Sequence, residues 1–104
     1  MENFINSHYY IAKSNIHGVG VMSNYNVLYN QIIDVGITYI LGIIPQVTEF
    51  GSYINHSFAP NCYLYYIDGQ YYVVANRFIY RHEEITVDYD MCPYFIKGSE
   101  DHFI

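Results

Sequence analysis

Residues 53–62 of the chain read Tyr-Ile-Asn-His-Ser-Phe-Ala-Pro-Asn-Cys. Residues 55–57 of this stretch are polar and stand between the apolar Ile54 and Phe58, and a Pro-Asn pair follows at 60–61. Polar side chains in apolar surroundings must satisfy their hydrogen bonds within the protein or use them to bind something. Taken alone, the run therefore has two interpretations: a tight turn held by a structural asparagine, or part of a ligand site.

A second informative stretch, residues 83–89, reads Glu-Glu-Ile-Thr-Val-Asp-Tyr. The two acids precede a β-branched run, which favours a strand, and we expect that strand to end at Tyr89. Paired acids on a turn are usually solvated, and a tyrosine in a strand usually packs against its neighbours. By itself this motif fits a structural role at least as well as a functional one.

Strand signals recur along the chain between turn residues, and no segment has a long helical stripe. Gly36 separates two short apolar runs, where we expect a bend or bulge. Pro45 is expected to end the second run, and one short helical turn is expected within residues 47–54. The expected strands before the hairpin are 9–12, 32–35 and 37–41, and residues 17–22 are expected to form a turn that runs into a further strand.

The clearest local signal is a hairpin. Two strand-like runs, 63–67 and 70–75, flank Asp68-Gly69. Asp-Gly at this position predicts a type I′ turn, in which both central residues have positive φ. Together with 14 Tyr and 6 Phe in 104 residues, these patterns predict a mainly β fold, and the length predicts one domain over residues 1–104.

Composition limits the partners. The chain has a formal net charge of −6 and only four Lys and Arg residues. Nucleic-acid binding normally needs a basic patch, so we expect no direct nucleic-acid partner. A basic peptide suits an acidic surface, although the charge could equally serve only to keep the protein soluble.

The cysteine content and the hydropathy of the chain indicate the cellular compartment in which the protein is expected. Cys62 and Cys92 do not form a disulfide framework and lack the close spacing of zinc ligands, so we expect no metal site. No apolar run approaches the roughly 20 residues that span a bilayer, and no secretion signal is recognisable. We therefore expect an intracellular protein, not secreted and without a membrane partner.

Residues 17–21, His-Gly-Val-Gly-Val, add a glycine turn that would be weak evidence alone. In this order, the glycine turn and the stretches at 53–62 and 83–89 resemble the SET domain of protein lysine methyltransferases, over roughly residues 9–95. The resemblance implies a fold of short strands in small sheets. It also implies a C-terminal pseudoknot that brings the last two motifs to one site.

The resemblance also implies a cofactor, S-adenosylmethionine, with S-adenosylhomocysteine as its product. The backbone around Gly18, Val19 and Gly20 would receive the methionine part. Asn55 would hold the polar end of the cofactor with its carboxamide. His56 would contact the adenine mainly through its main chain.

Tyr89 matches the family's catalytic tyrosine, whose hydroxyl lies where methyl group, sulfonium and lysine nitrogen meet. The acceptor lysine must enter as a neutral amine, and desolvation among aromatic rings beside a cation lowers its pKa. Candidates for the aromatic walls are Tyr53, Tyr63, Tyr94 and Phe95, each of which could instead belong to the core.

Two features depart from the family pattern. The stretch between the first and central motifs, residues 22–52, is short, and Val35 stands before Gly36 where the family often has a tyrosine. Tyr39 is a candidate substitute for it. Phe58 stands where some members have a zinc-binding cysteine, and no cysteine cluster follows the closing motif.

The leading interpretation is therefore a protein-lysine N-methyltransferase that uses S-adenosylmethionine and acts on a basic, histone-like tail. This interpretation is compatible with a chromatin role and with the nucleus. The alternative is a catalytically weak SET-like module that binds a peptide or a partner protein. A homodimer is a further expectation, because a small domain with open strand edges can bury apolar surface by self-association.

Overall fold

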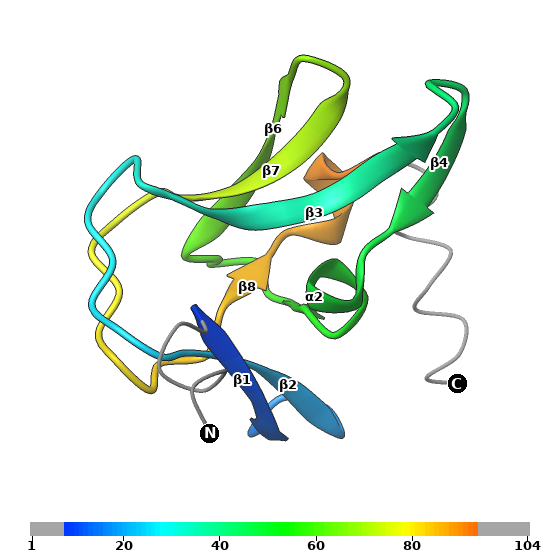
Figure 1. Ribbon diagram of the computed structural model, residues 1–104. Coiled ribbons are helices and arrows are strands. Elements are labelled where there is room, and N and C mark those ends of the chain that lie inside the picture. The colour runs from blue at the N-terminus through cyan, green and yellow to red at the C-terminus, as the bar shows by residue number, and fades with distance from the viewer. Residues whose placement is uncertain (1–7, 94–104) are drawn as a thin grey trace, which may run out of the picture.

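The computed structural model describes residues 8–93. It is mainly β, as predicted, and its strands form small sheets (Figure 1). The first sheet pairs β1 (Tyr9–Lys13) with β2 (Val19–Ser23) in antiparallel register. This pair carries the glycine turn of residues 17–20 at its end.

A four-stranded sheet has the order β4-β3-β7-β6. Its strands are β3 (Ile32–Ile40), β4 (Ile44–Val47), β6 (Cys62–Ile67) and β7 (Gln70–Ala75). The predicted hairpin is confirmed as β6 and β7. Asp68 and Gly69 have φ of 48° and 87°, so both central residues are in the left-handed region that a type I′ turn requires.

Strand β3 corrects two details of the prediction. It is one continuous strand rather than two runs. The bend or bulge expected at Gly36 is confirmed by a register shift against β7 between Val35 and Ile37, and a second shift lies between Ile32 and Asp34. The expectation that Pro45 ends the apolar run after Gly36 was wrong, because Pro45 lies inside β4 and pairs with Tyr39 of β3. β4 is an edge strand, and an edge tolerates a residue that has no N–H to donate.

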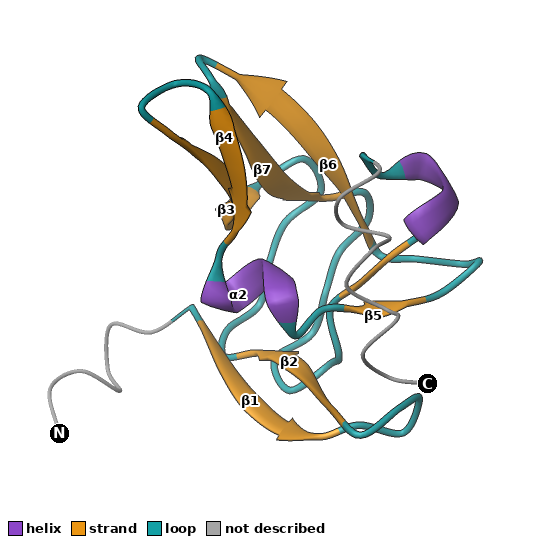
Figure 2. Cartoon of the chain, turned by 90° about the vertical axis from the view of Figure 1, so that its right-hand side faces the viewer, coloured by secondary structure: helices purple, strands orange, loops and turns teal. Residues whose placement is uncertain are grey.

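The predicted helical turn is α2 (Glu49–Ser52), which lies between the four-stranded sheet and the β1–β2 pair (Figure 2). Thr48 caps it by accepting a hydrogen bond from the Gly51 amide at 3.0 Å. The Thr48 hydroxyl also donates to the Val35 carbonyl at 2.7 Å. A Cβ on Gly51 would lie 2.4 Å from the Gly36 carbonyl oxygen, so only glycine permits this close contact between α2 and β3.

The central and closing motifs meet as a short parallel pair, β5 (Asn55–His56) with β8 (Thr86–Val87). The expected strand up to residue 89 is therefore shorter than predicted. Asp88 accepts a hydrogen bond from the Asp90 amide at 2.9 Å and caps a 3-10 helix, η1 (Tyr89–Met91). Tyr89 consequently begins a helical turn rather than ending a strand. The pairing of β5 with β8 does not by itself show the expected pseudoknot.

The core lies where the sheets and α2 meet. It consists of buried apolar side chains from most of the elements: Val21, Val27, Ile33, Ile37, Phe50, Ile54, Cys62, Val73, Ala75, Ile79, Ile85, Val87 and Tyr89. Loops 24–31 and 76–84 run alongside each other at one end of the molecule, where Val27 and Ile79 exchange backbone hydrogen bonds (Figure 1). Within residues 8–93, no helix has the length and apolarity that crossing a membrane would need.

Candidate functional site

The glycine turn is held by hydrogen bonds with the amide and the hydroxyl of Ser14. The Ser14 amide donates to the Gly18 carbonyl at 2.9 Å, and the Ser14 hydroxyl accepts from the amides of Ile16 and His17. Gly18 has φ of 48°, and nothing lies within 4 Å of the position that a Cβ would take. The turn therefore needs glycine for its conformation, and its outer side is open.

Asn55 links this turn to β5. Its side-chain nitrogen, Nδ2, lies 3.0 Å from the His17 carbonyl oxygen and 3.1 Å from that of Val19. The same nitrogen lies 3.1 Å from the Ser14 hydroxyl and 2.9 Å from Glu84 Oε2. Asn55 is only 3% exposed. The glycine turn and the central motif, 36 residues apart at Val19, therefore meet at one carboxamide.

The orientation of this carboxamide follows from its partners. All four neighbours of Nδ2 are oxygen atoms, so the nitrogen faces inward. Among the described residues no buried side-chain nitrogen or oxygen lacks a hydrogen-bond partner, and no partner is found for Asn55 Oδ1. Oδ1 must therefore be accessible to solvent, where it offers an acceptor to a ligand.

His56 joins β5 to η1. Its Nδ1 accepts a hydrogen bond from the Tyr89 amide at 2.9 Å, which requires Nδ1 to be unprotonated. Asp88 Oδ1 lies 3.8 Å from the same nitrogen, but an ion pair there would need a proton on Nδ1. The amide contact is shorter, so we assign the neutral ring with its proton on Nε2. The Phe58 ring packs edge-on against His56 with centroids 4.3 Å apart.

Tyr89 is 7% exposed, and its hydroxyl donates to the Ile54 carbonyl at 2.7 Å. Ile54 directly precedes Asn55, so the phenol of Tyr89 and the carboxamide of Asn55 belong to one region of the molecule. A cavity of about 10 Å³ lies beside Tyr89, roughly the space that one water molecule needs. Its other lining residues are Gly36, Gly51, Ser52, Ile54, Leu64, Val73 and Val87.

The structure thus brings together all six residues that the sequence singled out: Gly18, Val19, Gly20, Asn55, His56 and Tyr89. A family model described as the SET domain matches residues 4–90 of the chain. The chain belongs to the SET-domain family.

One solved structure similar to this SET domain is that of a Plasmodium falciparum protein provisionally identified as a histone methyltransferase. The two chains are 24% identical and superpose with a TM-score of 0.65. The superposed region covers 81% of this chain and 94% of the Plasmodium chain. At this identity the likeness establishes the fold. Among curated proteins, none matches the sequence. SET domains generally bind S-adenosylmethionine and are typically protein lysine methyltransferases.

The donor set of this SET domain fits the methionine part of that cofactor. An ammonium group needs acceptors, and Asn55 Oδ1 and the Glu84 carboxylate are acceptors on neighbouring residues. The open outer side of Gly18 leaves the backbone of the turn accessible. Gly20, by contrast, has no room, because a Cβ there would lie 3.1 Å from Asn55 Nδ2 and still closer to the Glu84 carboxylate.

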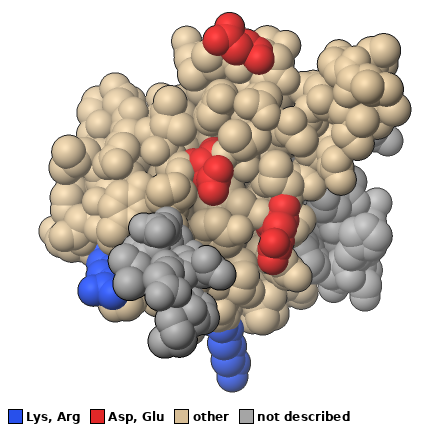
Figure 3. Space-filling model, in the orientation of Figure 1, with Lys and Arg blue, Asp and Glu red and all other residues tan. Residues whose placement is uncertain are grey.

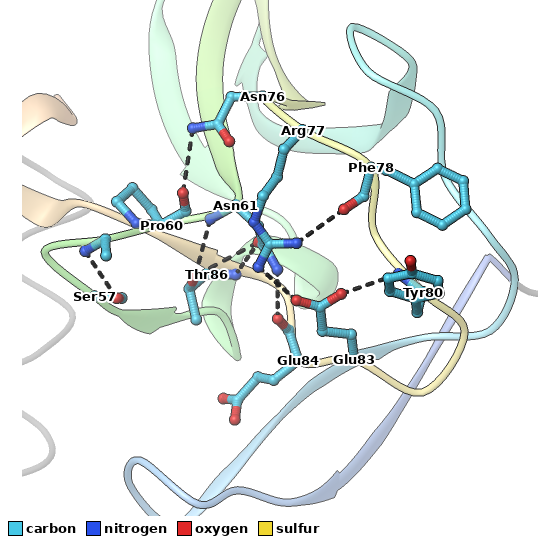
Figure 4. Close-up of polar contacts among 11 residues, drawn as sticks. Ser57, Pro60, Asn61, Asn76, Arg77, Phe78, Tyr80, Glu83, Glu84 and Thr86 are labelled. Carbon is cyan, nitrogen blue, oxygen red and sulfur yellow. Dashed lines mark hydrogen bonds and ion pairs between the residues drawn. The ribbon is translucent and has the colours of Figure 1, made fainter.

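Sequence reasoning missed three polar residues that hold the site. Ser14 and Glu84 contact Asn55, as described above. Asn61, 2% exposed, donates from Nδ2 to the Glu84 carbonyl at 2.8 Å and accepts from the Thr86 amide at 2.9 Å (Figure 4). Asn61 therefore holds β8 against the segment that follows β5. Its place in the Pro-Asn-Cys run was the only available signal.

Glu83 has a different environment from Glu84, although the two are adjacent in sequence. It forms an ion pair with Arg77 and accepts from the Tyr80 amide at 2.9 Å (Figure 4). Partial burial acts to raise the pKa of Glu83, but the hydrogen bonds from Arg77 and the Tyr80 amide outweigh burial and leave this pKa lowered. The hydrogen bond to Glu83 also raises the pKa of Arg77.

Charge is sparse on the face of the SET domain shown in Figure 3, where acidic side chains lie over the middle and upper part and basic ones at the lower border. Cys62 and Cys92 are not joined by a disulfide bond. Burial raises the pKa of the Cys62 thiol to about 12, although Arg77 acts to lower it. Within residues 8–93, no three His, Cys, Asp or Glu side chains are grouped so that they could hold a metal ion.

The candidate aromatic residues are dispersed. Tyr53 ends α2 and is 39% exposed. Tyr63 bonds to Asn30 at 3.3 Å and lines a pocket of about 200 Å³ between β6 and η1. Tyr94 and Phe95 lie outside the described residues. Tyr39, the candidate for the tyrosine missing at Val35, lies beside Tyr66 and Tyr71 instead of lining the cavity at Tyr89.

Proposed function

We propose that the protein transfers a methyl group from S-adenosylmethionine to a lysine of a protein, with a basic, histone-like tail as the substrate class. The observation that carries the proposal is the hydrogen bond from the Tyr89 hydroxyl to the Ile54 carbonyl, next to Asn55. It joins the tyrosine expected at the reacting atoms to the strand that carries the cofactor-binding asparagine. When bound, S-adenosylmethionine would supply an electrophilic methyl group on a sulfonium.

In this proposal, Asn55 and the backbone of residues 18–20 hold the methionine part, and the main chain of His56 contacts the adenine. The neutral His56 ring fixes η1 through the Tyr89 amide. Because the Tyr89 hydroxyl donates its proton to the Ile54 carbonyl, its oxygen can act toward other groups only as an acceptor. Polar oxygens around the reacting centre favour an in-line displacement by holding its partners in alignment.

The small cavity beside Tyr89 supports the acceptor side of the proposal. Apolar side chains such as Leu64, Val73 and Val87 form much of its wall. An amine that enters such surroundings loses hydration, and this lowers its pKa and favours the neutral, nucleophilic form. The negative net charge of the chain favours the approach of a basic peptide.

The alternative, a SET module that binds a peptide or partner with little catalysis, has one specific observation in its favour. Val35 precedes Gly36, and Tyr39 lies beside Tyr66 and Tyr71 rather than at the cavity. A hydroxyl that many family members have near the reaction would then be missing from this site.

The test is methyl transfer from labelled cofactor to a histone mixture, read by mass spectrometry. We expect lysine methylation by the wild type and a loss of about 10²-fold in Tyr89→Phe, the scale of removing one preorganised polar group. Tyr80→Phe is the matched control, because Tyr80 is exposed on the loop between β7 and β8. Its rate should equal that of the wild type.

Cofactor binding separates the two functions. At 100 times its dissociation constant, S-adenosylhomocysteine should stabilise the fold by about 2.7 kcal/mol. Stabilisation without methyl transfer to any histone would favour the binding module. The methyltransferase proposal fails if Tyr89→Phe transfers methyl groups as fast as the wild type.

A further inference from the structure

Glu84 lies at the junction of three segments of the site. The Ser14 hydroxyl, just after β1, is within hydrogen-bond distance of both carboxylate oxygens, at 2.8 Å from Oε1 and 2.9 Å from Oε2. Asn55 Nδ2 on β5 donates to Oε2 at 2.9 Å. On β2, a Cβ at Gly20 would lie 2.3 Å from Oε2. One carboxylate therefore fills the space that the second glycine of the turn leaves.

The neighbouring acid has a different orientation. Figure 4 shows the Glu83 carboxylate turned toward Arg77 and the Glu84 side chain extending away from that pair. Within the described part of the chain, the one ion pair that involves Lys or Arg joins Arg77 to Glu83, so no Lys or Arg neutralises Glu84. Its partners are a hydroxyl and an amide, both uncharged. A half-buried negative charge is thus left next to the proposed position of the methionine part.

The carboxylate also determines how Asn55 is oriented. If the carboxamide were flipped, Oδ1 would face the His17 and Val19 carbonyl oxygens and Glu84 Oε2, which are all acceptors. That arrangement replaces attraction by repulsion between lone pairs. Glu84 contributes the charged member of this set, and hydrogen bonds to charged groups are the stronger ones. Asn55 Oδ1 is consequently held on the accessible side.

We propose that Glu84 is a positioning residue for the cofactor. It holds the Asn55 carboxamide with Oδ1 toward the pocket, and its negative charge attracts the ammonium group on the amino-acid end of S-adenosylmethionine, a group that adenosine derivatives without that end lack. The inference rests on the proposed function, because it concerns the cofactor of that same site. It adds a residue that acts through Asn55, and not one that touches the reacting atoms.

Glu84→Gln is the direct test. It removes the charge, and its side-chain NH₂ must replace one of two oxygens that both accept hydrogen bonds. We expect the affinity for S-adenosylhomocysteine, measured by isothermal titration calorimetry, to fall about tenfold, which is about 1.4 kcal/mol. The affinity for 5′-methylthioadenosine, which has no amino-acid end, should stay within about twofold of the wild type, since Glu84 acts only on that end.

Glu83→Gln is the matched control, because it removes the same charge from the adjacent position without touching Asn55. It should change neither affinity. Circular dichroism shows whether each variant is folded. Should Glu84→Gln not fold, Glu84→Asp replaces it, because the shorter side chain keeps the charge but withdraws the carboxylate from Asn55 Nδ2. A loss of roughly threefold for S-adenosylhomocysteine alone is then expected.

Equal losses for both ligands in a folded Glu84→Gln protein would overturn the inference, because they would indicate a general structural effect. An unchanged affinity for S-adenosylhomocysteine would overturn it as well, while the proposed function would stand. If the wild type binds neither ligand, the proposed function fails and this inference fails with it.

Discussion

Replacing Asn61 with alanine is expected to lower the free energy of unfolding by about 2–4 kcal/mol. The Asn61 side chain bonds to the Glu84 carbonyl at 2.8 Å and the Thr86 amide at 2.9 Å, in a region that is 2% exposed at Asn61. Alanine would leave both backbone groups without partners, and each unsatisfied buried group costs about 1–3 kcal/mol. This expected loss is a large share of the free energy of unfolding of a typical domain, which is about 5–15 kcal/mol.

Urea denaturation followed by circular dichroism measures this loss, since the chain has no tryptophan. One kcal/mol corresponds to roughly 4–8 °C in a domain of about 100 residues, so the melting temperature should fall by at least about 8 °C. Asn76→Ala is the matched control. Asn76 is exposed, its side chain makes only a 3.3 Å bond to the Pro60 carbonyl, and its loss should cost less than about 0.5 kcal/mol.

The result that refutes this reasoning is an Asn61→Ala protein within about 0.5 kcal/mol of the wild type at an unchanged denaturant slope. It would mean that water or a backbone shift satisfies the two groups without the side chain. If both the free energy of unfolding and its dependence on urea concentration fell, the result would instead indicate loss of the cooperative fold around β8.

Three further predictions follow from other parts of the molecule. Cys62, with its pKa raised to about 12 by burial, should react with an alkylating reagent at pH 8 only when urea unfolds the chain, which a mass-based labelling time course would show. Because the pKa of Glu83 is lowered, the stability from its pair with Arg77 is present above the unfolded value of 4.5 and lost as pH falls through the folded value. Glu83→Gln should therefore lower the free energy of unfolding by up to about 1 kcal/mol at pH 7, and this cost should shrink as the pH is lowered below 4.5. Leu41 and Ile43 are 86% and 77% exposed at the tip of the β3–β4 hairpin, whose paired residues 37–47 carry no charge. They should support the predicted homodimer, so light scattering should give a dimer mass for the wild type and a monomer mass for Leu41→Lys; a wild-type monomer would contradict this prediction.

Local chemistry explains why some elements could be predicted. The β6–β7 hairpin depends on Asp68-Gly69 and on strand-forming neighbours, all within a short stretch of chain. The short helical turn within 47–54 was likewise predictable. The six candidate site residues were named because three motifs, in the right order, resembled the SET domain. Their roles toward a cofactor stay predictions.

Other features depended on contacts between distant residues. Pro45 belongs to a strand because β4 is at the edge of its sheet, which the sequence does not reveal. The strand before Tyr89 is short because Asp88 caps η1 and only Thr86 and Val87 pair with β5. Ser14 and Glu84 are 70 positions apart, and each looks like an ordinary surface residue when read in order.

The sequence by itself determined the strand content, the tight turn at residues 68–69 and the identity of the polar groups at positions 55 and 89. Periodicity, turn chemistry and residue type act over a few neighbouring positions, so they can be read along the chain. Only the tertiary structure decided which way the amide of Asn55 faces and which of two adjacent acids meets it. Those choices depend on hydrogen bonds and excluded volume among segments that approach one another only after the chain has folded.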